Sequence, residues 1–185
     1  MAPPSPGRDS GFAEAFIALG GNLGEVLKTF RAALAELDRG PVEVLAVSSA
    51  YRTCALVLAG TSVPVADYWN AAARVRTTLA PEALLSLMLA IERRAGRRRV
   101  EAARWQPRTL DLDLLLFDDI LCSAPHLSLP HPHLAERLFV LLPLVEVAAA
   151  TLVPGADASV ADLLARLGPD RASIRERRDD WYTSG

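Results

Sequence analysis

The chain has 185 residues, a formal net charge of −2 at pH 7 and 51% apolar residues, which is typical of one globular domain with a single core. The charge balance argues against a general nucleic-acid binder. No apolar run approaches the roughly 20 residues of a membrane span, and the first residues lack the hydrophobic core of a secretory signal. Two cysteines are too few for a disulfide framework. We therefore expect a cytoplasmic protein that binds neither nucleic acid nor membrane.

The first part of the chain predicts an extension, a strand, a turn and a helix. Residues 1–11 are rich in proline, glycine and serine without periodicity, which is typical of a disordered extension. Residues 12–19 are a plausible strand ended by the Gly-Gly-Asn turn at 20–22, and apolar residues then recur at helical spacing over 25–37. The turn either lets backbone approach a ligand or only supplies a tight bend.

The middle of the chain predicts two strands separated by a long loop. A Gly-Pro pair ends the first helix, and residues 42–52 have the alternation and β-branched content of a strand. Residues 53–67 have no periodicity, and a loop of this length is usually a lid, a binding loop or a disordered stretch. A third strand follows over 68–77, in which Asn70 either bonds backbone at the strand end or contacts a ligand.

The remaining chain predicts further helices and strands and a charged end. In order, we expect a helix over 81–94, a strand from about Thr109, a hairpin return through 120–122, a helix over 135–147 and a short helix over 160–167. Residues 171–185 are charged and expected to be a peripheral tail, so the single domain is predicted to span 12–170.

The run that begins at Arg104, RWQPRTLDLD, contains the most informative pattern. Its proline delays regular strand pairing until about Thr109. Asp111 and Asp113 then alternate with leucines, so both carboxylates should lie on one face of the strand, roughly 7 Å apart. That spacing suits one Mg²⁺ or a pair of ions, because magnesium takes one or two protein carboxylates and completes its shell with water and phosphate. The alternative is the solvated face of a half-exposed sheet.

A cluster of arginines precedes the acidic strand. Seven arginines and a single acid, Glu101, lie between Arg93 and Arg108. Carboxylate-bound magnesium and guanidinium groups are two means by which proteins neutralise a polyphosphate, so the combination indicates a phosphate ligand. A solvated basic helix end and loop is the alternative. Lys28 is the only lysine and no GxxxxGK[ST] motif occurs, so a lysine-based phosphate loop is excluded.

Two histidines lie in a Pro-His-Pro-His segment. His131 and His133 have no third partner in the sequence, which makes a poor transition-metal site. A histidine that donates to a phosphate is the better interpretation beside an arginine cluster. Arg137 is expected in the first turn of the next helix, where the macrodipole favours an acid. It should therefore pair with Glu136 or another neighbour, or serve a ligand.

These motifs occur in the order found in the 6-hydroxymethyl-7,8-dihydropterin pyrophosphokinase family, which the chain resembles over about residues 16–147. The segments that carry the similarity are IALGGNLG from Ile17, SSAYRT from Ser48, DYWNAA from Asp67, RWQPRTLDLDLLLFDD from Arg104 and HPHLAERLFVLLPLVEVA from His131. The resemblance implies a ferredoxin-like α+β fold, a mostly antiparallel sheet with helices packed on one face of it. It also implies transfer of the β,γ-diphosphoryl group of ATP to the hydroxymethyl oxygen of the pterin, in folate biosynthesis.

The resemblance also assigns roles to individual residues. The catalytic residues would be Arg97, Arg108, Asp111 and Asp113, of which the two acids would hold two Mg²⁺ ions. The ATP side would comprise Arg99, Arg104, Trp105, His131 and Arg137. The pterin side would comprise Thr53, Tyr68, Asn70 and Phe139, with Glu92 as support for the site. The expected partners are the small-molecule substrates ATP and the pterin, and we expect a monomer.

The chain departs from the family at several positions. Gln106 replaces a usual glycine, Gly21 a usual serine, and the loop 54–66 lacks the usual glycine and Gln-Pro pair. One extra residue before Trp105 leaves open which arginine among Arg97, Arg98 and Arg99 takes which role. Two other functions stay open: an inactive relative that retains nucleotide affinity, and a metal-dependent phosphohydrolase that uses the same two acids.

Overall fold

The computed structural model describes residues 11–54, 66–96, 107–168 and 174–182. The elements, in order, are β1 (Ala13–Gly21), α1 (Val26–Leu37), β2 (Val42–Val47), β3 (Ala50–Thr53), β4 (Tyr68–Thr77), α2 (Pro81–Arg94), β5 (Asp111–Phe117), β6 (Cys122–Ala124), β7 (Leu127–Leu129), the 3₁₀ helix η1 (Leu134–Glu136), α3 (Leu138–Ala148), β8 (Leu152–Val153), β9 (Ala158–Ser159), α4 (Val160–Leu167) and β10 (Ile174–Arg178). Within the described ranges, no helix combines the length and the apolar character needed to cross a membrane.

The main sheet is antiparallel throughout and has the strand order β10-β3-β4-β1-β5. β2 and β3 lie end to end along β4, with Val47 paired to Ala73 and Tyr51 to Asn70. When β2 and β3 are counted as one broken strand, the elements from β1 to β5 follow a β-α-β-β-α-β order with the two crossing helices on one side, which is the ferredoxin-like arrangement. The predicted fold class is confirmed.

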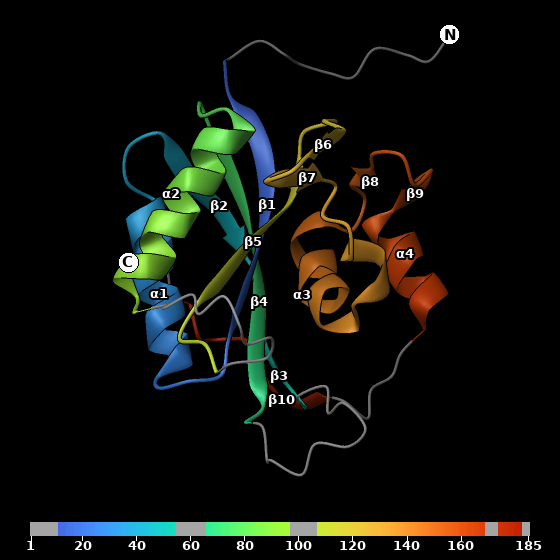
Figure 1. Cartoon of the computed structure of the whole chain (residues 1–185). Helices are drawn as coiled ribbons and strands as arrows, with labels where there is room; N and C mark the ends of the chain where they lie inside the picture. Colours follow the sequence, from blue (N-terminus) through green and yellow to red (C-terminus); the bar gives the residue numbers. More distant parts are fainter. Residues whose placement is uncertain (1–10, 55–65, 97–106, 169–173, 183–185) are drawn as a thin grey trace, which may run out of the picture.

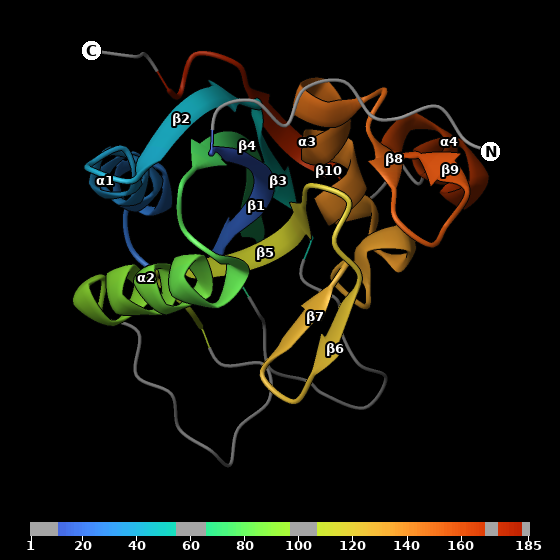
Figure 2. The same ribbon diagram turned by 90° about the horizontal axis from the view of Figure 1, so that it is seen from above.

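Helices cover both faces of the sheet rather than one (Figures 1 and 2). α1 and α2 pack on one face, whose core includes Ile17 and Phe30, while α3 packs on the other, whose core includes Phe16 and Leu141. α4 packs against α3. The expectation of helices on a single face is therefore wrong. The reason lies in β1, where apolar residues occupy consecutive positions and each face needs its own cover.

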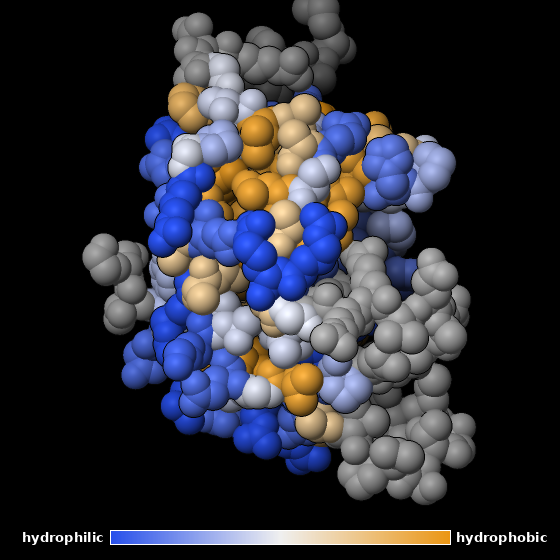
Figure 3. Space-filling view, turned by 60° about the vertical axis from the view of Figure 1, so that its left-hand side comes forward, coloured by the Kyte–Doolittle hydropathy of each residue, from blue (hydrophilic) through white to orange (hydrophobic). Residues whose placement is uncertain are grey.

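The outer surface of α1 and α2 carries charged residues. An ion pair joins Glu36 of α1 to Arg94 of α2. Seen from this side, hydrophilic residues border a smaller area of apolar ones (Figure 3). α2 begins at Pro81, and Gly96, with a φ of +86°, follows its end. The helix bounds predicted from proline and glycine are therefore confirmed.

The predicted strand over 42–52 is broken at Ser48 and Ser49. The Ser48 amide donates to Ala72 O at 2.9 Å, and the Ser48 hydroxyl accepts the Ala72 amide at 2.8 Å. The Ser48 carbonyl accepts the indole N–H of Trp181 at 2.8 Å. The break in the strand thus supplies a hydrogen-bond acceptor to Trp181, which lies far along the sequence.

The C-terminal segment belongs to the fold. β10 pairs with β3 at the edge of the sheet, and Trp181 is only 4% exposed, with its ring packed edge-on against Phe30 at 5.8 Å. The expectation that residues 171–185 are a peripheral tail is therefore wrong for 174–182. The remaining residues of that segment, and the extension predicted over 1–10, lie outside the described residues.

Two other local predictions differ from the structure. β6 pairs with β7 in a separate two-stranded sheet, so residues 120–122 do not return along β5. Arg137 has an extended backbone at the N-cap of α3, between η1 and the helix, so it is outside the first helical turn. Its N-cap position still leaves the cation near the N-terminus of α3, where the helix macrodipole favours an acid.

Candidate active site

A cavity of about 340 Å³ lies where β1, β3, β4 and β5 face the start of α3. Small residues of β1, Ala18 and Gly20, line part of it and leave room between the sheet and the helix. The sequence-predicted site residues that line the cavity are Thr53, Tyr68, Asn70, Arg108, Asp111, Asp113, Arg137 and Phe139. Tertiary structure thus brings together side chains that are up to 86 residues apart in the sequence.

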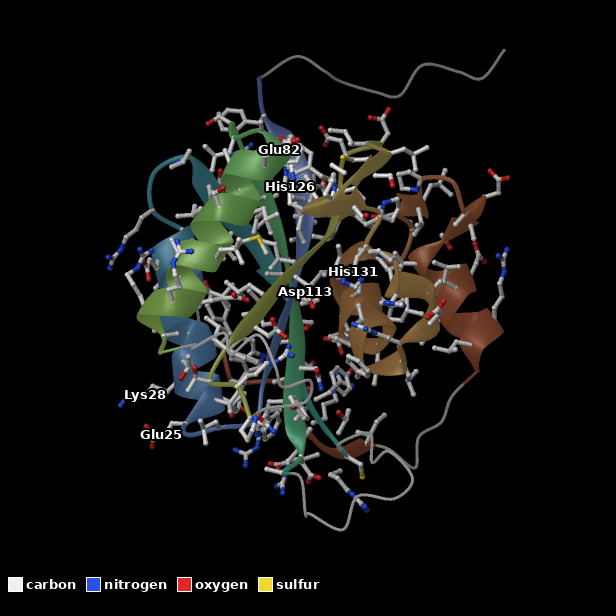
Figure 4. All side chains as sticks on the ribbon, viewed as in Figure 1. Glu25, Lys28, Glu82, Asp113, His126 and His131 are labelled. Atoms are coloured by element: carbon white, nitrogen blue, oxygen red, sulfur yellow. The ribbon has the colours of Figure 1, made fainter. Side chains whose placement is uncertain are left out.

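The two acids of β5 have the orientation that the alternation predicts. Leu110 and Leu112 are buried in the core on the side of α1 and α2, whereas Asp111 and Asp113 are partly exposed and line the cavity. Figure 4 labels Asp113 on the side of β5 that faces α3. Side chains alternate along a strand, so one apolar face and one acidic face follow directly from the sequence pattern.

The donor set of this cavity fits magnesium better than a transition metal. Carboxylate oxygens are hard ligands, and Mg²⁺ needs only one or two of them when phosphate and water complete its shell. Within the described residues, no group of three or more His, Cys, Asp or Glu side chains could hold a metal. Asp111 and Asp113, which both line the cavity, are the candidate ligands.

Arg108 places positive charge beside the acidic pair. Its guanidinium forms an ion pair with the Asp111 carboxylate. Burial disfavours the charged form of Arg108, but the interaction with Asp111 outweighs burial, and the pKa of Arg108 is raised. The side chain thus stays cationic next to the cavity, where a phosphate group would need it.

The Gly-Gly-Asn turn holds the Arg108 segment in place. The amides of Asn22 and Leu23 donate to Arg108 O at 2.9 and 3.1 Å, and the Arg108 amide donates to Asn22 Oδ1 at 2.7 Å. A Cβ atom on Gly21 would lie 2.9 Å from Thr109 O, so a side chain at this position would force the two segments to shift apart. The turn thus makes a backbone contact within the protein, which is neither of the two uses that the sequence suggested. Sequence reasoning missed the role of Asn22, because the segment it holds lies far along the chain.

A second wall of the cavity consists of aromatic rings and of side chains with amide or hydroxyl groups. The Asn70 side-chain amide donates to the Thr53 hydroxyl at 3.0 Å, and both residues are buried. Phe139 lies under the guanidinium of Arg137, with 5.8 Å from Arg137 Cζ to the ring centre. Burial raises the pKa of Tyr68; Arg108 opposes the rise and Asp111 adds to it. Tyr68 is therefore a neutral ring at the border between the aromatic wall and the charged groups.

His131 is held as a neutral ring. Burial, together with electrostatic interactions with Arg137 and His133, lowers the pKa of His131 to about 4, against the opposing effect of Asp111. Nδ1 of His131 accepts the His133 amide at 3.2 Å, so the proton of the neutral ring lies on Nε2. The His131 amide is also fixed, because it donates to Leu115 O at 2.9 Å. The ring can thus donate a hydrogen bond from Nε2 without carrying charge.

The depressed pKa of His131 makes stability depend on pH. Between pH 4 and about 6.5 the unfolded state binds more protons at this site than the folded state, so the free energy of unfolding should rise with pH across this window and level off above it. We expect His131→Asn, which keeps an acceptor for the His133 amide, to flatten that dependence. Urea denaturation at pH 4.5, 5.5 and 7 measures it, and an unchanged pH dependence in the variant would contradict this account.

Glu92 supports the acidic strand from α2. Glu92 is 2% exposed, and its carboxylate accepts the Leu112 amide at 2.8 Å. β5 is an edge strand of the sheet, so this amide would otherwise lack a strand partner on that side. Since Leu112 lies between the two acids, the bond from α2 fixes the part of β5 that presents them to the cavity.

Replacement of Glu92 by leucine is expected to lower the free energy of unfolding by about 1–3 kcal/mol, because it leaves the buried Leu112 amide without this acceptor. Glu92→Gln retains an acceptor oxygen and should cost clearly less. Chemical denaturation of the two variants provides the comparison. Equal losses of stability in the two variants would show that the acceptor for the Leu112 amide does not determine the effect.

Four predicted site residues, Arg97, Arg99, Arg104 and Trp105, lie outside the described residues, as does Arg98. Val140, which sequence reasoning did not propose, also lines the cavity, and so does Cys54. Cys54 directly follows Thr53 at the start of the long loop, and its position next to a predicted contact was the available signal.

The family model for 7,8-dihydro-6-hydroxymethylpterin-pyrophosphokinase matches residues 16–149. A Synechocystis protein named 2-amino-4-hydroxy-6-hydroxymethyldihydropteridine pyrophosphokinase is 39% identical over 89% of this chain and 82% of its own length. A Bacillus subtilis protein of the same name is 42% identical over 72% of this chain and 77% of its own length.

Solved structures share the fold at lower sequence identity. The Plasmodium falciparum HPPK-DHPS wild type with pterin and p-hydroxybenzoate matches 86% of this chain with a TM-score of 0.65 and 15% identity. This chain spans 44% of that longer chain. Because the family model covers most of the sequence and the curated relatives match over most of their own lengths, the chain belongs to the 7,8-dihydro-6-hydroxymethylpterin-pyrophosphokinase family.

Proposed function

We propose that this chain transfers the β,γ-diphosphoryl group of ATP to the hydroxymethyl oxygen of 6-hydroxymethyl-7,8-dihydropterin. In this reaction the hydroxymethyl oxygen forms a bond to the β-phosphorus of ATP. The bond from that phosphorus to the oxygen shared with the α-phosphate breaks, AMP leaves with this oxygen, and the hydroxyl proton is released. The products are AMP and the pterin diphosphate, an intermediate of folate biosynthesis.

The observation that carries the proposal is the composition of one cavity. Asp111, Asp113 and Arg108 lie in the same 340 Å³ space as the aromatic and amide groups Phe139 and Asn70. A polyphosphate needs the first set, and a flat heterocycle with polar edges needs the second. Phosphoryl-type transfer depends mainly on positioning and charge neutralisation, and a cavity that binds both groups side by side provides the positioning.

The acidic pair and the arginines have separate roles. Asp111 and Asp113 would hold Mg²⁺, which would supply charge neutralisation on the polyphosphate. Arg108 forms an ion pair with Asp111 and is assigned to the charge that develops on the transferred group. His131 and Arg137 are assigned to the nucleotide, the first as a neutral donor through Nε2 and the second as a cation at the start of α3. Arg97, Arg99, Arg104 and Trp105 keep the roles that the family resemblance implies.

The pterin is assigned to the aromatic and amide wall. Tyr68 from β4 and Phe139 from α3 offer ring faces for stacking. Asn70 and Thr53, whose side chains are hydrogen-bonded to each other, present polar atoms to the edge of a ring bound there. Exclusion of water by these buried groups strengthens each polar contact.

The test is product formation with each substrate omitted in turn. With Mg²⁺, ATP and the dihydropterin present, AMP and pterin diphosphate should appear in equal amounts, and AMP should not form without the pterin. Phosphate release from ATP without any acceptor would instead indicate a phosphohydrolase. Nucleotide binding with no product under either condition would indicate an inactive relative.

We also propose a metal requirement, an oligomeric state and a cellular location. The metal requirement is two Mg²⁺ ions, which is supported by two carboxylates at alternate strand positions and is tested by metal titration of the rate. The protein acts as a monomer, which sedimentation of the purified chain tests. It acts in the cytoplasm, which fractionation of the source cells tests.

A further inference from the structure

The C-terminal strand β10 lies beyond the family-matched residues, which end at 149. It pairs with β3 in a register that places Arg177 opposite Tyr51 and Ile174 opposite Thr53. In Figure 1 both strands lie at the same end of the sheet. A strand outside the matched region therefore pairs with β3, one of the strands that line the cavity.

Arg177 of β10 makes a cluster of contacts behind the cavity. Its guanidinium lies 5.6 Å from the ring centre of Tyr51 and donates to the Ser49 hydroxyl at 3.0 Å. It also pairs with Glu146 of α3 at 3.4 Å and with Asp179 at 2.6 Å. One side chain of the C-terminal strand thus contacts both the β3 region and α3.

Glu146 connects the same two elements. Its carboxylate accepts the Tyr51 hydroxyl and, at 2.7 Å, the Ser49 amide. Burial raises the pKa of Tyr51, and the hydrogen bond to Glu146 raises it further, so the phenol remains a donor at neutral pH. Glu146 therefore ties α3 to β3 through two hydrogen bonds, with Arg177 as its counter-charge.

These contacts lie next to the residues that form the pterin side. Thr53 follows Tyr51 by two residues, so both side chains point to the same face of β3. Phe139 precedes Glu146 by seven residues, which is about two helical turns and returns to the same face of α3. The cavity thus opens between the same strand and helix that the Glu146 contacts hold together.

We propose that Arg177 is a positioning residue for the pterin side of the site. By holding Glu146 and Tyr51 it sets the spacing between β3 and α3, and hence between Thr53 and Phe139. This inference rests on the proposed function, because it concerns the pterin that the function requires. It assigns to the C-terminal strand a role in substrate recognition that lies outside the family-matched residues.

The test compares Arg177→Met with a matched control. Arg76→Met removes a similar arginine, which pairs with Glu43 and lies 5.0 Å from the ring centre of Phe12. Arg76 is six residues along β4 from Asn70, roughly 20 Å away. The side chains of the two arginines are similarly exposed, at 53% and 46%, so each substitution removes a half-exposed ion pair and a cation–ring contact.

The readout is the dissociation constant of the dihydropterin, measured by calorimetry in the presence of Mg²⁺ and a non-hydrolysable ATP analogue, together with the KM of each substrate. We expect Arg177→Met to raise the pterin dissociation constant about tenfold, because small displacements of positioning groups have large effects. The KM of ATP should change less than twofold. Arg76→Met should leave both constants unchanged, and Arg177→Lys should recover part of the loss by restoring the charge.

A second variant separates positioning from general loss of structure. Tyr51→Phe removes the hydroxyl that bonds Glu146 and should also weaken pterin binding. The double variant Arg177→Met/Tyr51→Phe should lose less than the product of the two separate effects, because both act through Glu146. Multiplicative effects in the double variant would overturn the proposed route through that residue.

The possible results are distinguishable. Absence of pterin binding by the unaltered protein would overturn the proposed function and this inference with it. Equal pterin affinity of the unaltered protein and Arg177→Met would overturn the inference alone. A lower melting temperature with unchanged binding constants, or equal losses for ATP and pterin, would also overturn it, since the contacts would then only stabilise the fold.

Discussion

Replacement of either Asp111 or Asp113 by asparagine is expected to lower the rate of AMP formation by about 10³-fold or more. Asparagine keeps the size of the side chain and a carbonyl oxygen but removes the negative charge that a hard divalent cation requires. Both acids are partly exposed at the cavity, so the fold should remain intact. Initial rates with saturating substrates, together with thermal denaturation followed by circular dichroism, measure the two quantities separately.

Asp118→Asn is the matched control for this experiment. Asp118 follows the far end of β5, and its Oδ1 accepts the Glu14 amide at 2.8 Å, a bond that asparagine can also accept. Its φ of +44° is a conformation that asparagine tolerates. The control should keep the full rate. Rates close to normal in both the Asp111 and the Asp113 variants would remove the basis of the proposed metal site.

Replacement of Trp181 by alanine is expected to lower the free energy of unfolding by about 3–5 kcal/mol. The indole is buried against Phe30, and its N–H donates to the Ser48 carbonyl at 2.8 Å. Its removal leaves a cavity between α1 and the sheet and a carbonyl without this donor. Equilibrium unfolding in urea, with the midpoint and the slope fitted separately, measures the loss.

Two comparisons make the Trp181 result specific. Leu152→Ala truncates a side chain that is 72% exposed and should change stability by less than about 0.5 kcal/mol. Trp181→Phe keeps an aromatic ring but not the N–H, and should fall between the two. If Trp181→Ala were as stable as Leu152→Ala, the C-terminal segment would not be part of the core that the structure describes.

Some features of this protein were predictable because they depend on neighbouring residues alone. The two-residue period of a strand placed Asp111 and Asp113 on one face and Leu112 on the other, whatever surrounds them. The start of α4 was likewise local, because Ser159 and Asp162 form a reciprocal capping box. The family motifs added the aromatic and amide residues of the cavity, and the structure places those that it describes around the same space.

Other features were not predictable because their cause lies far away in the sequence. Residues 174–178 carry four charged side chains in the run Ile-Arg-Glu-Arg-Arg, which resembles a solvated tail. They form a strand because the edge of β3 offers backbone partners. The break at Ser48 has the same kind of cause, since its carbonyl is used by Trp181, 133 residues later.

The sequence by itself determined the class of fold, the acidic and basic groups available for phosphate chemistry, and the face on which the two acids lie. These depend on chain periodicity and side-chain chemistry, which act over a few residues. Only the tertiary structure decided that helices cover both faces, that Asn22 holds the Arg108 segment, and that Arg177, Glu146 and Tyr51 meet behind the cavity. Such contacts depend on which distant surfaces bury one another, and local pattern does not contain that information.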